Sequence, residues 1–542
     1  MKTNIKWNKK TKYIFITGGV FSSLGKGLSA ASIGCLLNQL GLKITSIKLD
    51  PYLNVDPGTM SPYQHGEVYV TKDGMETDLD LGHYERFLNV ELTSLSSITA
   101  GKIYNKVIKA ERDGKYVGKT IQVIPHVTDE IKNSIYQLGN ETNSDIVIVE
   151  IGGTIGDIES IPFVEAMRQI KYELPDNQAV CIHVVPIIEI SPSYEIKTKP
   201  LQHSIKELRS FGIEPDLLLV RSNKEISDDI KNKIAITTYV KLKNIFSCVD
   251  LDNIHLLPEY LYKQKIHNAL AKKLNLKFKS KTLSKKFSDL ISAIKNQKTQ
   301  SLIKIAIVGK YTQLKDAYIS IYESLKIASY YQNINLELVW IDAVLKKEQI
   351  IEELKKVNGL VIPGGFDNRG IDGKLFAIQY ARENKLPFLG ICLGMQLACV
   401  EFARNVLNLK DANSTEFNPD TKNKILDLIV KNKVQLGGTL RLGNYECSIK
   451  SNTLASKIYN KKNIKRRHRH RYEFNNDYLK DFEKAGFIFS GVNKKNNLQE
   501  IIEIKNHPFF IATQYHPEFN STLYQPEVLF VNLIKNAKQY KK

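Results

Sequence analysis

Residues 17–30 read TGGVFSSLGKGLSA, a glycine-rich stretch that decides how the N-terminal half of the chain is interpreted. A phosphate-binding loop has the pattern G-x-x-x-x-G-K-[ST], in which the last hydroxyl helps to hold Mg²⁺. Here five residues separate Gly19 from Gly25, and Gly27 follows Lys26 where serine or threonine is expected. The stretch therefore indicates either a nucleotide site whose metal is held by other residues or a glycine-rich turn without a ligand.

Short β-branched runs alternate with amphipathic stretches around this loop. The runs are bordered by Gly, Pro or polar residues, as buried strands are, and the stretches between them have helical periodicity. This alternation predicts parallel β-α-β units in a doubly wound sheet, whose ligands bind at the carboxyl ends of the strands. The expected strands are KYIFITGG (12–19), KITSIKLD (43–50), DIVIVEIGG (145–153), AVCIHVVP (179–186) and DLLLVRS (216–222), and the expected helices include 29–41, 164–174 and 202–212.

A polar, Lys-rich segment at residues 279–300 interrupts the alternation and is typical of a connector that is helical at most. A second α/β series follows it, with no fixed-period repeat. We therefore expect two doubly wound α/β domains, residues 1–278 and 301–542, joined by residues 279–300. The second series comprises IKIAIVGKY (303–311), LELVWID (336–342), GLVIPGG (359–365), PFLGICLG (387–394) and FFIATQYHPEF (509–519).

The composition is that of an ordinary globular protein, with 542 residues, 42% hydrophobic and 25% charged. The formal charge of +20 raises the question of a nucleic-acid partner, but the lysines are scattered among Asn and Ile, which favours a compositional bias over a basic groove. The six cysteines form no C-x-x-C pair, the N-terminus has no apolar leader, and no run of about 18 apolar residues occurs. We expect a cytoplasmic protein without a nucleic-acid or membrane partner.

The chemistry of the second half centres on one cysteine. Cys392 stands in G-x-C-x-G between an apolar run and a helical run, which is the thiol version of a nucleophile elbow; a buried packing thiol is the equal alternative. His516 and Glu518 follow another expected strand and are spaced so that the acid can orient the imidazole. The turn PGGF (363–366) offers backbone amides for an oxyanion.

The order PGG, G-x-C-x-G and HPE resembles class I glutamine amidotransferase domains. The resemblance implies that Cys392 attacks the side-chain amide of glutamine, that His516 moves protons and that Glu518 positions it. It also implies an oxyanion hole from the amides of Gly365 and Leu393, whereas Cys399 packs inside the following helix. Further glutamine-binding residues implied by the resemblance are Gly394, Met395, Gln396, Glu416 and Arg471.

Four stretches of the first half extend the resemblance. They are SSLGKG (22–27), the long irregular loop at 48–87, VEIGGTIGDIES (149–160) and KTKPLQHS (197–204), and a loop of that length inside a compact domain is usually functional. Over residues 12–535 the chain closely resembles the CTP synthase family. This implies a P-loop-like, dethiobiotin-synthetase-like amidoligase before the glutamine domain. It also implies that ATP phosphorylates O4 of UTP and that ammonia from glutamine then displaces the phosphate.

The resemblance also assigns the nucleotide and metal residues. Lys26 and Lys48 are the catalytic cations, and Asp80 and Glu150 are Mg²⁺ ligands that replace the missing hydroxyl. Taken singly, these residues also fit a turn, a solvated loop acid and a strand-end acid. The ATP contacts are Ser23, Leu24, Gly25, Lys26, Gly27, Leu28, Asp80, Val249, Asp250 and Leu251. The UTP and CTP contacts are Ser22, Asp157, Ile158, Glu159, Lys197, Thr198, Lys199, Pro200, Leu201, Gln202 and Lys233, with Lys197 and Lys199 together in one extended segment.

Regulation and assembly follow from the same resemblance. CTP is expected as product and inhibitor, the assembly as a homotetramer that can form filaments, and GTP as an allosteric activator. Two departures put GTP activation in doubt, because Asp367 and Asn368 replace Gly and an aromatic residue and Lys315 replaces Pro. The segment before Leu436 is also shorter than in many relatives. The basic run KRRHRHRYEF (465–474) also suggests RNA contact, but it matches the family at this place.

Two other functions are compatible with part of the sequence. An ATP-dependent amidotransferase for a carboxylate, such as a corrinoid side chain, shares the phosphate loop and the Cys domain but does not need GTMSPYQHGEV (58–68) or KTKPLQHS. A non-enzymatic scaffold is disfavoured because Lys26, Asp80, Glu150 and the Cys-His-Glu set are all retained.

Overall fold

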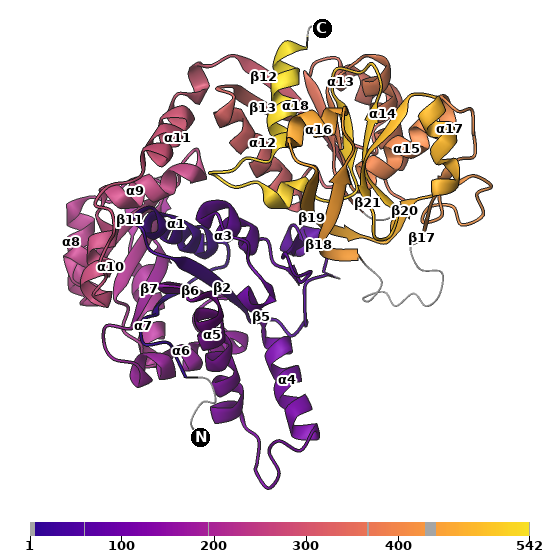
Figure 1. Ribbon diagram of the computed structural model, residues 1–542. Helices are drawn as coiled ribbons and strands as arrows, with labels where there is room; N and C mark the ends of the chain where they lie inside the picture. The colour runs from indigo at the N-terminus through magenta and orange to yellow at the C-terminus, as the bar shows by residue number, and fades with distance from the viewer. Residues whose placement is uncertain (1–5, 59, 193–194, 366–367, 429–440, 541–542) are drawn as a thin grey trace. The chain divides into compact units, whose positions relative to one another are not determined.

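The computed structural model describes residues 6–58, 60–192, 195–365, 368–428 and 441–540. The chain forms two compact units, each built on one large sheet (Figure 1). The N-terminal unit comprises residues 1–57 and 80–294, and the C-terminal unit comprises residues 58–79 and 295–542. This division differs from the predicted one in two places, because residues 58–79 group with the C-terminal unit and the boundary lies inside the expected connector. Asp367 and the shortened segment at residues 429–440, two of the departures noted above, lie outside the described residues.

The sheet of the N-terminal unit has seven parallel strands in the order β11-β10-β7-β1-β6-β2-β5. The five strands expected from the sequence are confirmed as β1, β2, β6, β7 and β10, and their apolar runs are almost wholly buried. β1 lies between β6 and β7, where the strand order reverses, and such a switch point is where doubly wound sheets bind ligands. The strands are β1 (Lys12–Gly18), β2 (Ile44–Asp50), β5 (Ser97–Thr99), β6 (Ile146–Ile151), β7 (Ala179–Pro186), β10 (Leu217–Ser222) and β11 (Ile245–Val249), with a small hairpin of β8 (Ile188–Ile190) and β9 (Glu195–Lys197).

Helices pack on both faces of this sheet (Figure 1). Apolar side chains from strands β1, β2, β6 and β7 and from helices α4 to α6 form one continuous core cluster. The helices are α1 (Lys26–Gln39), α3 (Asp80–Leu88), α4 (Ala100–Arg112), α5 (Thr128–Thr142), α6 (Ile161–Glu173), α7 (Lys199–Ser210), α8 (Asp228–Thr238), α9 (Leu257–Lys263) and α10 (Ile266–Leu274).

The expected connector is more ordered than its polar composition indicates. Residues Lys285–Lys295 form helix α11, whose Phe287, Leu290, Ile291 and Ile294 are buried. Because these four side chains recur at helical spacing, the segment has an apolar face that the Lys-rich composition hides.

The C-terminal unit has a nine-stranded sheet in the order β13-β12-β14-β15-β23-β22-β21-β18-β19. The first five strands are parallel, as expected, and the remaining four continue the sheet in antiparallel fashion. The sheet strands are β12 (Leu302–Gly309), β13 (Asn335–Asp342), β14 (Gly359–Ile362), β15 (Phe388–Ile391), β18 (Arg441–Ile449), β19 (Asn463–His470), β21 (Phe487–Asn493), β22 (Leu498–Ile504) and β23 (Phe510–Thr513). A second, small sheet contains β16 (Asn413–Ser414), β17 (Lys424–Leu428) and β20 (Tyr472–Phe474). The helices are α12 (Ile319–Tyr331), α13 (Lys347–Leu354), α14 (Ile371–Glu383), α15 (Leu393–Asn405), α16 (Leu454–Tyr459), α17 (Leu479–Lys484) and α18 (Val528–Gln539).

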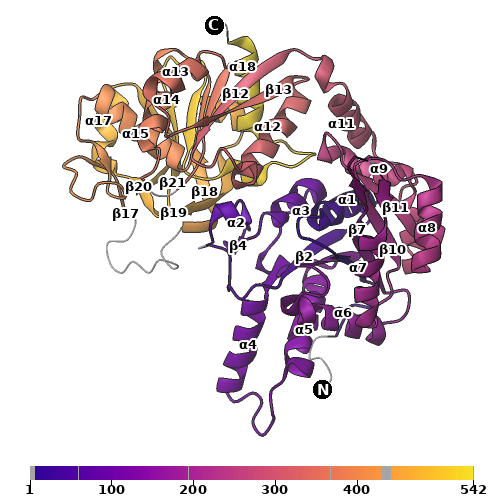
Figure 2. The same ribbon diagram turned by 180° about the vertical axis from the view of Figure 1, so that it is seen from behind.

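Residues 58–79 cover the antiparallel end of this sheet. They form α2 (Pro62–His65) and a hairpin of β3 (Tyr69–Val70) and β4 (Glu76–Thr77), seen beside β18 and β19 in Figure 2. The amide of Asn444 donates to the Lys72 carbonyl at 3.0 Å, and the buried Arg467 donates to the Tyr69 hydroxyl at 2.8 Å. These contacts attach the segment to the C-terminal unit.

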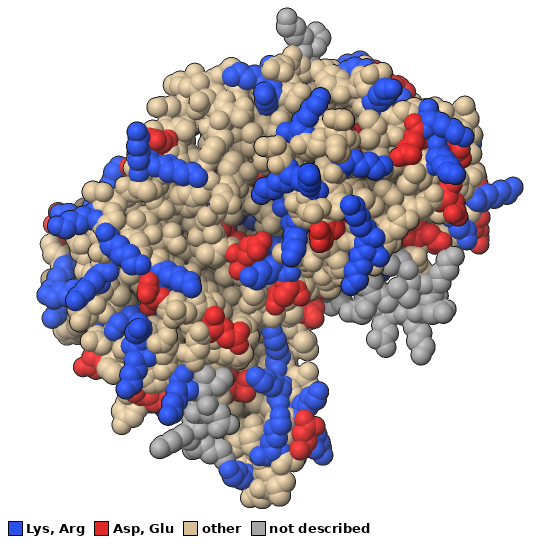
Figure 3. All heavy atoms as spheres, in the orientation of Figure 1, with Lys and Arg blue, Asp and Glu red and all other residues tan. Residues whose placement is uncertain are grey.

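Charged side chains are spread over the surface. On the face drawn in Figure 3, Lys and Arg are scattered, with Asp and Glu among them. Within the described ranges, every helix is too short or too polar to cross a bilayer.

Candidate active site

Cys392 lies at the sharp turn between β15 and α15, with φ +52° and ψ −104°. The neighbouring Gly390 and Gly394 must be glycines, because a side chain at either position would not fit. A Cβ on Gly394 would lie 2.3 Å from the Ile362 carbonyl oxygen, and a Cβ on Gly390 would lie 2.9 Å from the backbone of Gly394. The G-x-C-x-G spacing therefore forms the expected elbow and places the thiol at the start of a helix, where unpaired amides favour negative charge.

His516 and Glu518 lie directly after β23, and His516 Nδ1 is 2.7 Å from Glu518 Oε1. Burial lowers the pKa of His516, but the negative charges of Glu518 and of a Cys392 thiolate outweigh burial and raise this pKa to about 10. The ring of Phe519 stacks on the imidazole at 5.1 Å. The imidazole is therefore oriented by an acid and held by an aromatic ring, with Nε2 left for the thiol.

The thiol and the imidazole share a small cavity of about 110 Å³. A Cβ on Gly364 would lie 3.1 Å from His516 Cε1 and 3.4 Å from Cys392 Cβ, so the two side chains lie side by side at the expected oxyanion turn. The lining also includes Gly365, Tyr311, Tyr318, Arg469, and Glu67 and Val68 from the 58–79 segment.

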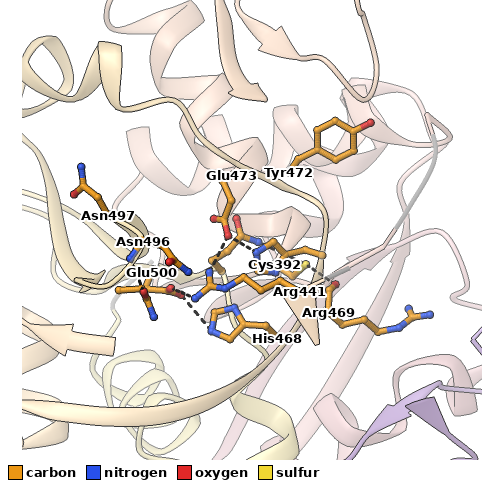
Figure 4. Close-up of polar contacts among 12 residues, drawn as sticks. Cys392, Arg441, His468, Arg469, Tyr472, Glu473, Asn496, Asn497 and Glu500 are labelled. Atoms are coloured by element: carbon orange, nitrogen blue, oxygen red, sulfur yellow. Dashed lines mark hydrogen bonds and ion pairs between the residues drawn. The ribbon is translucent and has the colours of Figure 1, made fainter. Parts of the chain in front are cut away.

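The thiol also contacts strand β19 at Arg469 (Figure 4) and, beyond β23, the side chain of Gln514. Cys392 Sγ is 3.7 Å from the Arg469 carbonyl oxygen, and Gln514 Nε2 is 3.8 Å from Sγ. Behind it, the buried Arg441 donates to Glu473 at 2.8 Å and to Glu500 at 2.6 Å. Within this network, Glu473 belongs to the basic run that suggested RNA contact.

The side chains of that run are buried or half-buried, except that of Lys465, which is exposed. Arg467, His468 and His470 are buried on β19. His470 Nε2 lies 2.7 Å from Glu473 Oε1, and His468 Nε2 lies 3.3 Å from Glu500 Oε2. Half of the basic run is therefore interior structure of the sheet.

The expected glutamine-binding residues fall in two groups. Gly365 lines the cavity, whereas Leu393, Gly394, Met395 and Gln396 form the first turn of α15. Gln396 Nε2 donates to the Tyr472 carbonyl at 3.0 Å. Burial raises the pKa of Tyr472, Glu416 raises it further and Arg471 lowers it, so both charges lie near this tyrosine. Gln396, Glu416 and Arg471 thus gather around Tyr472, outside the lining of the small cavity.

In the N-terminal unit, the structure shows why the glycine-rich loop has Gly27 where the usual pattern has serine or threonine. Gly25 has φ +89° at the start of α1, and the buried Lys26 donates to the Gly153 carbonyl at 2.7 Å. A Cβ on Gly27 would lie 2.0 Å from Asp80 Oδ1. The carboxylate of Asp80 therefore lies where the serine or threonine side chain of the usual loop would begin.

Lys48, Asp80 and Glu150 form one charged cluster. Lys48 and Glu150 are register partners on β2 and β6, with Nζ 3.2 Å from Oε1, and Lys48 also bonds Asp80. Burial raises the pKa of Glu150 and Lys48 lowers it. Burial likewise lowers the pKa of Lys26, against the pull of Glu150. The predicted metal ligands and catalytic cations therefore meet at the carboxyl edge of the sheet.

A cavity of about 560 Å³ lies beside the loop and contains the predicted pyrimidine residues Asp157, Lys199 and Pro200. Val20, Ser204 and Glu207 also line it. The predicted contacts Ser22, Ile158, Glu159, Lys197, Thr198, Leu201, Gln202 and Lys233 are not part of its lining, and the Leu201 side chain is buried in the core.

The prediction that Lys197 and Lys199 share one extended segment is wrong. Lys197 ends β9 and lies 2.6 Å from Glu195, whereas Lys199 begins α7. The chain turns into a helix here, with Pro200, a residue favoured in the first helical turn, next to Lys199. Lys197 and Lys233 both lower the pKa of Glu195, so Lys233 lies near this pair.

A third cavity of about 210 Å³ joins the loop to the end of β11. Its lining includes the predicted ATP residues Leu24, Gly25, Leu28, Val249, Asp250 and Leu251. Arg221, at the carboxyl end of β10, also lines it and was not predicted. It bonds Asp250 Oδ1 at 3.0 Å and the Ser23 carbonyl at 3.1 Å. A cavity of about 1060 Å³ near Lys171, Asp216 and Lys273 contains none of the predicted residues.

Several residues at the thiol site were missed by sequence reasoning. They are Glu67, Val68, Tyr311, Arg469, Gln514 and Phe519. Gln514 and Phe519 lie within two residues of the HPE motif, so the sequence could have indicated that they belong to the site. Glu67 and Val68 had no such signal, because chain order placed them in the first domain.

The comparisons with known proteins agree with this geometry. The family model described as "Glutamine amidotransferase class-I" matches residues 313–536, and "CTP synthase N-terminus" matches residues 12–276. The fold and the thiol site thus define a glutamine amidotransferase unit on a chain that also carries a synthase unit. The chain is 51% identical to the CTP synthase of Halalkalibacterium halodurans, over 97% of this chain and 99% of that protein. It is 52% identical to the CTP synthase of a Hydrogenobaculum species, over 98% of each.

The chain therefore belongs to the CTP synthase family, whose members are glutamine-hydrolysing ligases that make CTP from UTP. Among solved structures, the glutaminase domain of the Trypanosoma brucei CTPS with bound acivicin is similar. It is 33% identical over 44% of this chain and 95% of that one, with a TM-score of 0.42.

Proposed function

We propose that this chain aminates UTP with ammonia that a Cys392–His516–Glu518 triad releases from glutamine. Cys392 attacks the amide carbon, a glutamyl thioester forms, and His516 donates a proton to the leaving ammonia. Water then attacks the thioester, His516 takes its proton, and glutamate leaves. The amides of Gly365 and Leu393 stabilise the oxyanion of each tetrahedral intermediate. The 2.7 Å contact between His516 and Glu518, in the cavity that holds Cys392, carries this proposal.

In the N-terminal unit, O4 of UTP attacks the γ-phosphorus of ATP and ADP leaves. Ammonia then adds at C4 and phosphate departs, giving CTP. Lys26 and Lys48 are the cations that neutralise the transferring group, because both are buried at the loop and close to Glu150. The cavity with Lys199 takes the pyrimidine nucleotide, and the cavity with Val249 to Leu251 takes the adenine side of ATP.

Asp80 and Glu150 fit Mg²⁺, because both are hard oxygen donors that converge on one cation, Lys48. No group of three or more His, Cys, Asp or Glu that can hold a metal occurs within the described ranges. Two carboxylates fit Mg²⁺, because proteins commonly hold this ion by one or two carboxylates together with substrate phosphates. When bound, Mg²⁺ supplies charge neutralisation to the triphosphate.

The division of labour is tested with Cys392→Ala. Because ammonia is made at the thiol and used elsewhere, the variant is expected to lose CTP formation from glutamine and to keep CTP formation from ammonium salts. CTP is measured chromatographically with UTP, ATP and Mg²⁺. Loss of both activities in a folded variant would contradict the proposal, and amide formation on a carboxylate acceptor with no CTP would favour the alternative ligase.

Regulation and assembly stay proposals of the same kind. We infer that CTP inhibits the chain, that GTP is the candidate activator of glutamine hydrolysis despite the departures at Asn368 and Lys315, and that the active form is a homotetramer. Glutamine hydrolysis with and without GTP tests the second point, and light scattering with UTP and ATP tests the third.

A further inference from the structure

Three buried polar side chains beneath the phosphate loop form a continuous chain of hydrogen bonds. Thr17 Oγ1 lies 2.8 Å from His183 Nδ1, and His183 Nε2 lies 2.8 Å from Ser204 Oγ. Thr17 and His183 are fully buried, and Ser204 is nearly so. A hydroxyl can donate or accept, so a neutral imidazole between two hydroxyls satisfies both ring nitrogens.

The three residues come from three elements that meet at the nucleotide site. Thr17 on β1 is the register partner of His183 on β7, so their side chains share one face of the sheet. Thr17 stands two residues before Gly19, where the loop begins. Ser204 is on α7 and lines the 560 Å³ cavity together with Lys199. The hydrogen bonds therefore join the phosphate loop to the helix of the proposed pyrimidine cavity.

Helix α7 also lies directly against the loop. A Cβ on Gly19 would be 1.5 Å from Ser204 Oγ and 2.6 Å from Ser204 Cβ. This distance leaves no room for a side chain, so the position of Ser204 fixes how closely the helix approaches the loop. A small displacement of α7 would change the separation of the two nucleotide sites.

His183 is neutral in this position. Burial lowers its pKa, and the positive charge of Lys26 lowers it further, to about 3. The imidazole therefore adds no charge beneath the phosphate site, and its two bonds persist across the pH range of an assay.

We propose that His183 is a positioning residue that holds the pyrimidine cavity at a fixed separation and orientation from the phosphate loop. The inference rests on the proposed function of these two sites. His183 touches neither nucleotide; it acts through Thr17 and Ser204. Phosphoryl transfer depends on in-line placement of acceptor and donor, so loss of this chain slows transfer more than it weakens binding.

The most direct variant is Thr17→Val, which removes one hydroxyl, preserves the side-chain shape and lies out of reach of substrate. With UTP, ATP and an ammonium salt, kcat is expected to fall about tenfold while the KM values for UTP and ATP change less than about twofold. Thr45→Val is the matched control, because Thr45 is a buried threonine on β2 of the same sheet and lies outside the chain of hydrogen bonds. It is expected to keep the wild-type kcat.

A double-mutant cycle distinguishes a connected chain from independent effects. If His183 transmits between its neighbours, Ser204→Ala added to Thr17→Val lowers kcat little further than either change alone. His183→Asn, whose amide can reach the position of Nδ1, is expected to recover more of kcat than His183→Ala.

Unchanged kcat in Thr17→Val, or equal losses in Thr17→Val and Thr45→Val, would overturn the inference. The inference would also be overturned if the loss of kcat in the Thr17→Val/Ser204→Ala variant equals the product of the two single losses. Failure of the proposed function gives a different result, because the wild-type chain would then form no CTP from UTP, ATP and ammonium. Thermal unfolding and the two KM values report whether each variant is folded.

Discussion

The thiol site and the nucleotide site are built in opposite ways. At the thiol site, Cys392, His516 and Glu518 meet in one cavity of about 110 Å³, and His516 already bonds its acid. At the proposed nucleotide site, the cations already have partners, because Lys48 is joined to Asp80 and Glu150 and Lys26 to a backbone carbonyl. The predicted contacts there are divided between cavities of about 560 and 210 Å³.

The difference teaches what each site needs from its ligand. A thiol with its base in place can attack a neutral amide without rearrangement of charge. Asp80 and Glu150 balance the charge of Lys48, and Lys26 bonds a backbone carbonyl, so a triphosphate bound at the proposed site would have to replace those partners. Substitutions at the thiol site should therefore slow the chemical step, whereas substitutions at the proposed nucleotide site should change how the substrates are positioned.

The largest effect is expected from Glu518→Gln. The amide cannot stabilise the imidazolium of His516, so glutamine hydrolysis should fall by about 10³-fold. CTP formation from ammonium salts should be unchanged, because the acid serves only the C-terminal unit. Glutamate release and CTP formation are measured on the same preparation. Equal losses in the two reactions would show that the two sites are not separable in this way.

Gly27→Ser restores the hydroxyl of the usual phosphate loop and is expected to damage this enzyme. The new Cβ would lie 2.0 Å from Asp80 Oδ1, so the loop or the carboxylate must move. A displacement of this size at a phosphoryl-transfer site can cost about 100-fold in kcat for ammonia-dependent CTP formation. Gly139→Ser, on α5 where the nearest atoms are 3.3 Å away, is the matched control. Wild-type activity in Gly27→Ser would place Asp80 away from the loop during catalysis.

The regions around these two substitutions also illustrate how much of the structure could be predicted from the sequence. The parallel strands of both units and the G-x-C-x-G elbow followed from apolar runs and local spacing, which act over a few residues. The 58–79 segment was assigned to the wrong unit, because nothing local to it shows that Tyr69 accepts a hydrogen bond from Arg467, almost four hundred positions later. The antiparallel half of the second sheet was missed for a related reason. β19 is a basic run, and its buried Arg467 and His468 have partners far along the chain, at Tyr69 and Glu500.

The charge state of the triad can be examined through stability. The folded pKa of His516 is about 10, above its ordinary value of 6.5, so the folded state holds this proton more tightly than the unfolded state. The contribution to stability is complete below pH 6.5, declines as pH rises, and is lost above pH 10. The slope is at most about 1.4 kcal/mol per pH unit.

The double variant His516→Gln/Glu518→Gln removes this titration. Its difference from wild type in the free energy of urea unfolding should shrink between pH 6.5 and 10. Fluorescence of Trp340 in a Trp7→Phe background reports the C-terminal unit. A difference that stays constant over this range would mean that the imidazole is neutral in the resting enzyme.

The smallest effect is expected from a substitution of Arg221. This substitution tests whether the proposed nucleotide site acts mainly by positioning its substrates. Its guanidinium bonds Ser23 of the loop and Asp250 beside β11 at once. A lysine cannot bond both Asp250 and the Ser23 carbonyl in this geometry. Arg221→Lys should therefore raise the KM for ATP by about tenfold, which is the contribution of one or two hydrogen bonds, and leave kcat nearly unchanged. Arg168→Lys is the matched control, since Arg168 makes a similar two-pronged bond to Glu165 on an exposed helix face of the same unit. If Arg221→Lys instead lowers kcat and leaves KM unchanged, Arg221 acts on the transferring phosphate, and the contrast between a chemical site and a placement site does not extend to the adenine-side cavity.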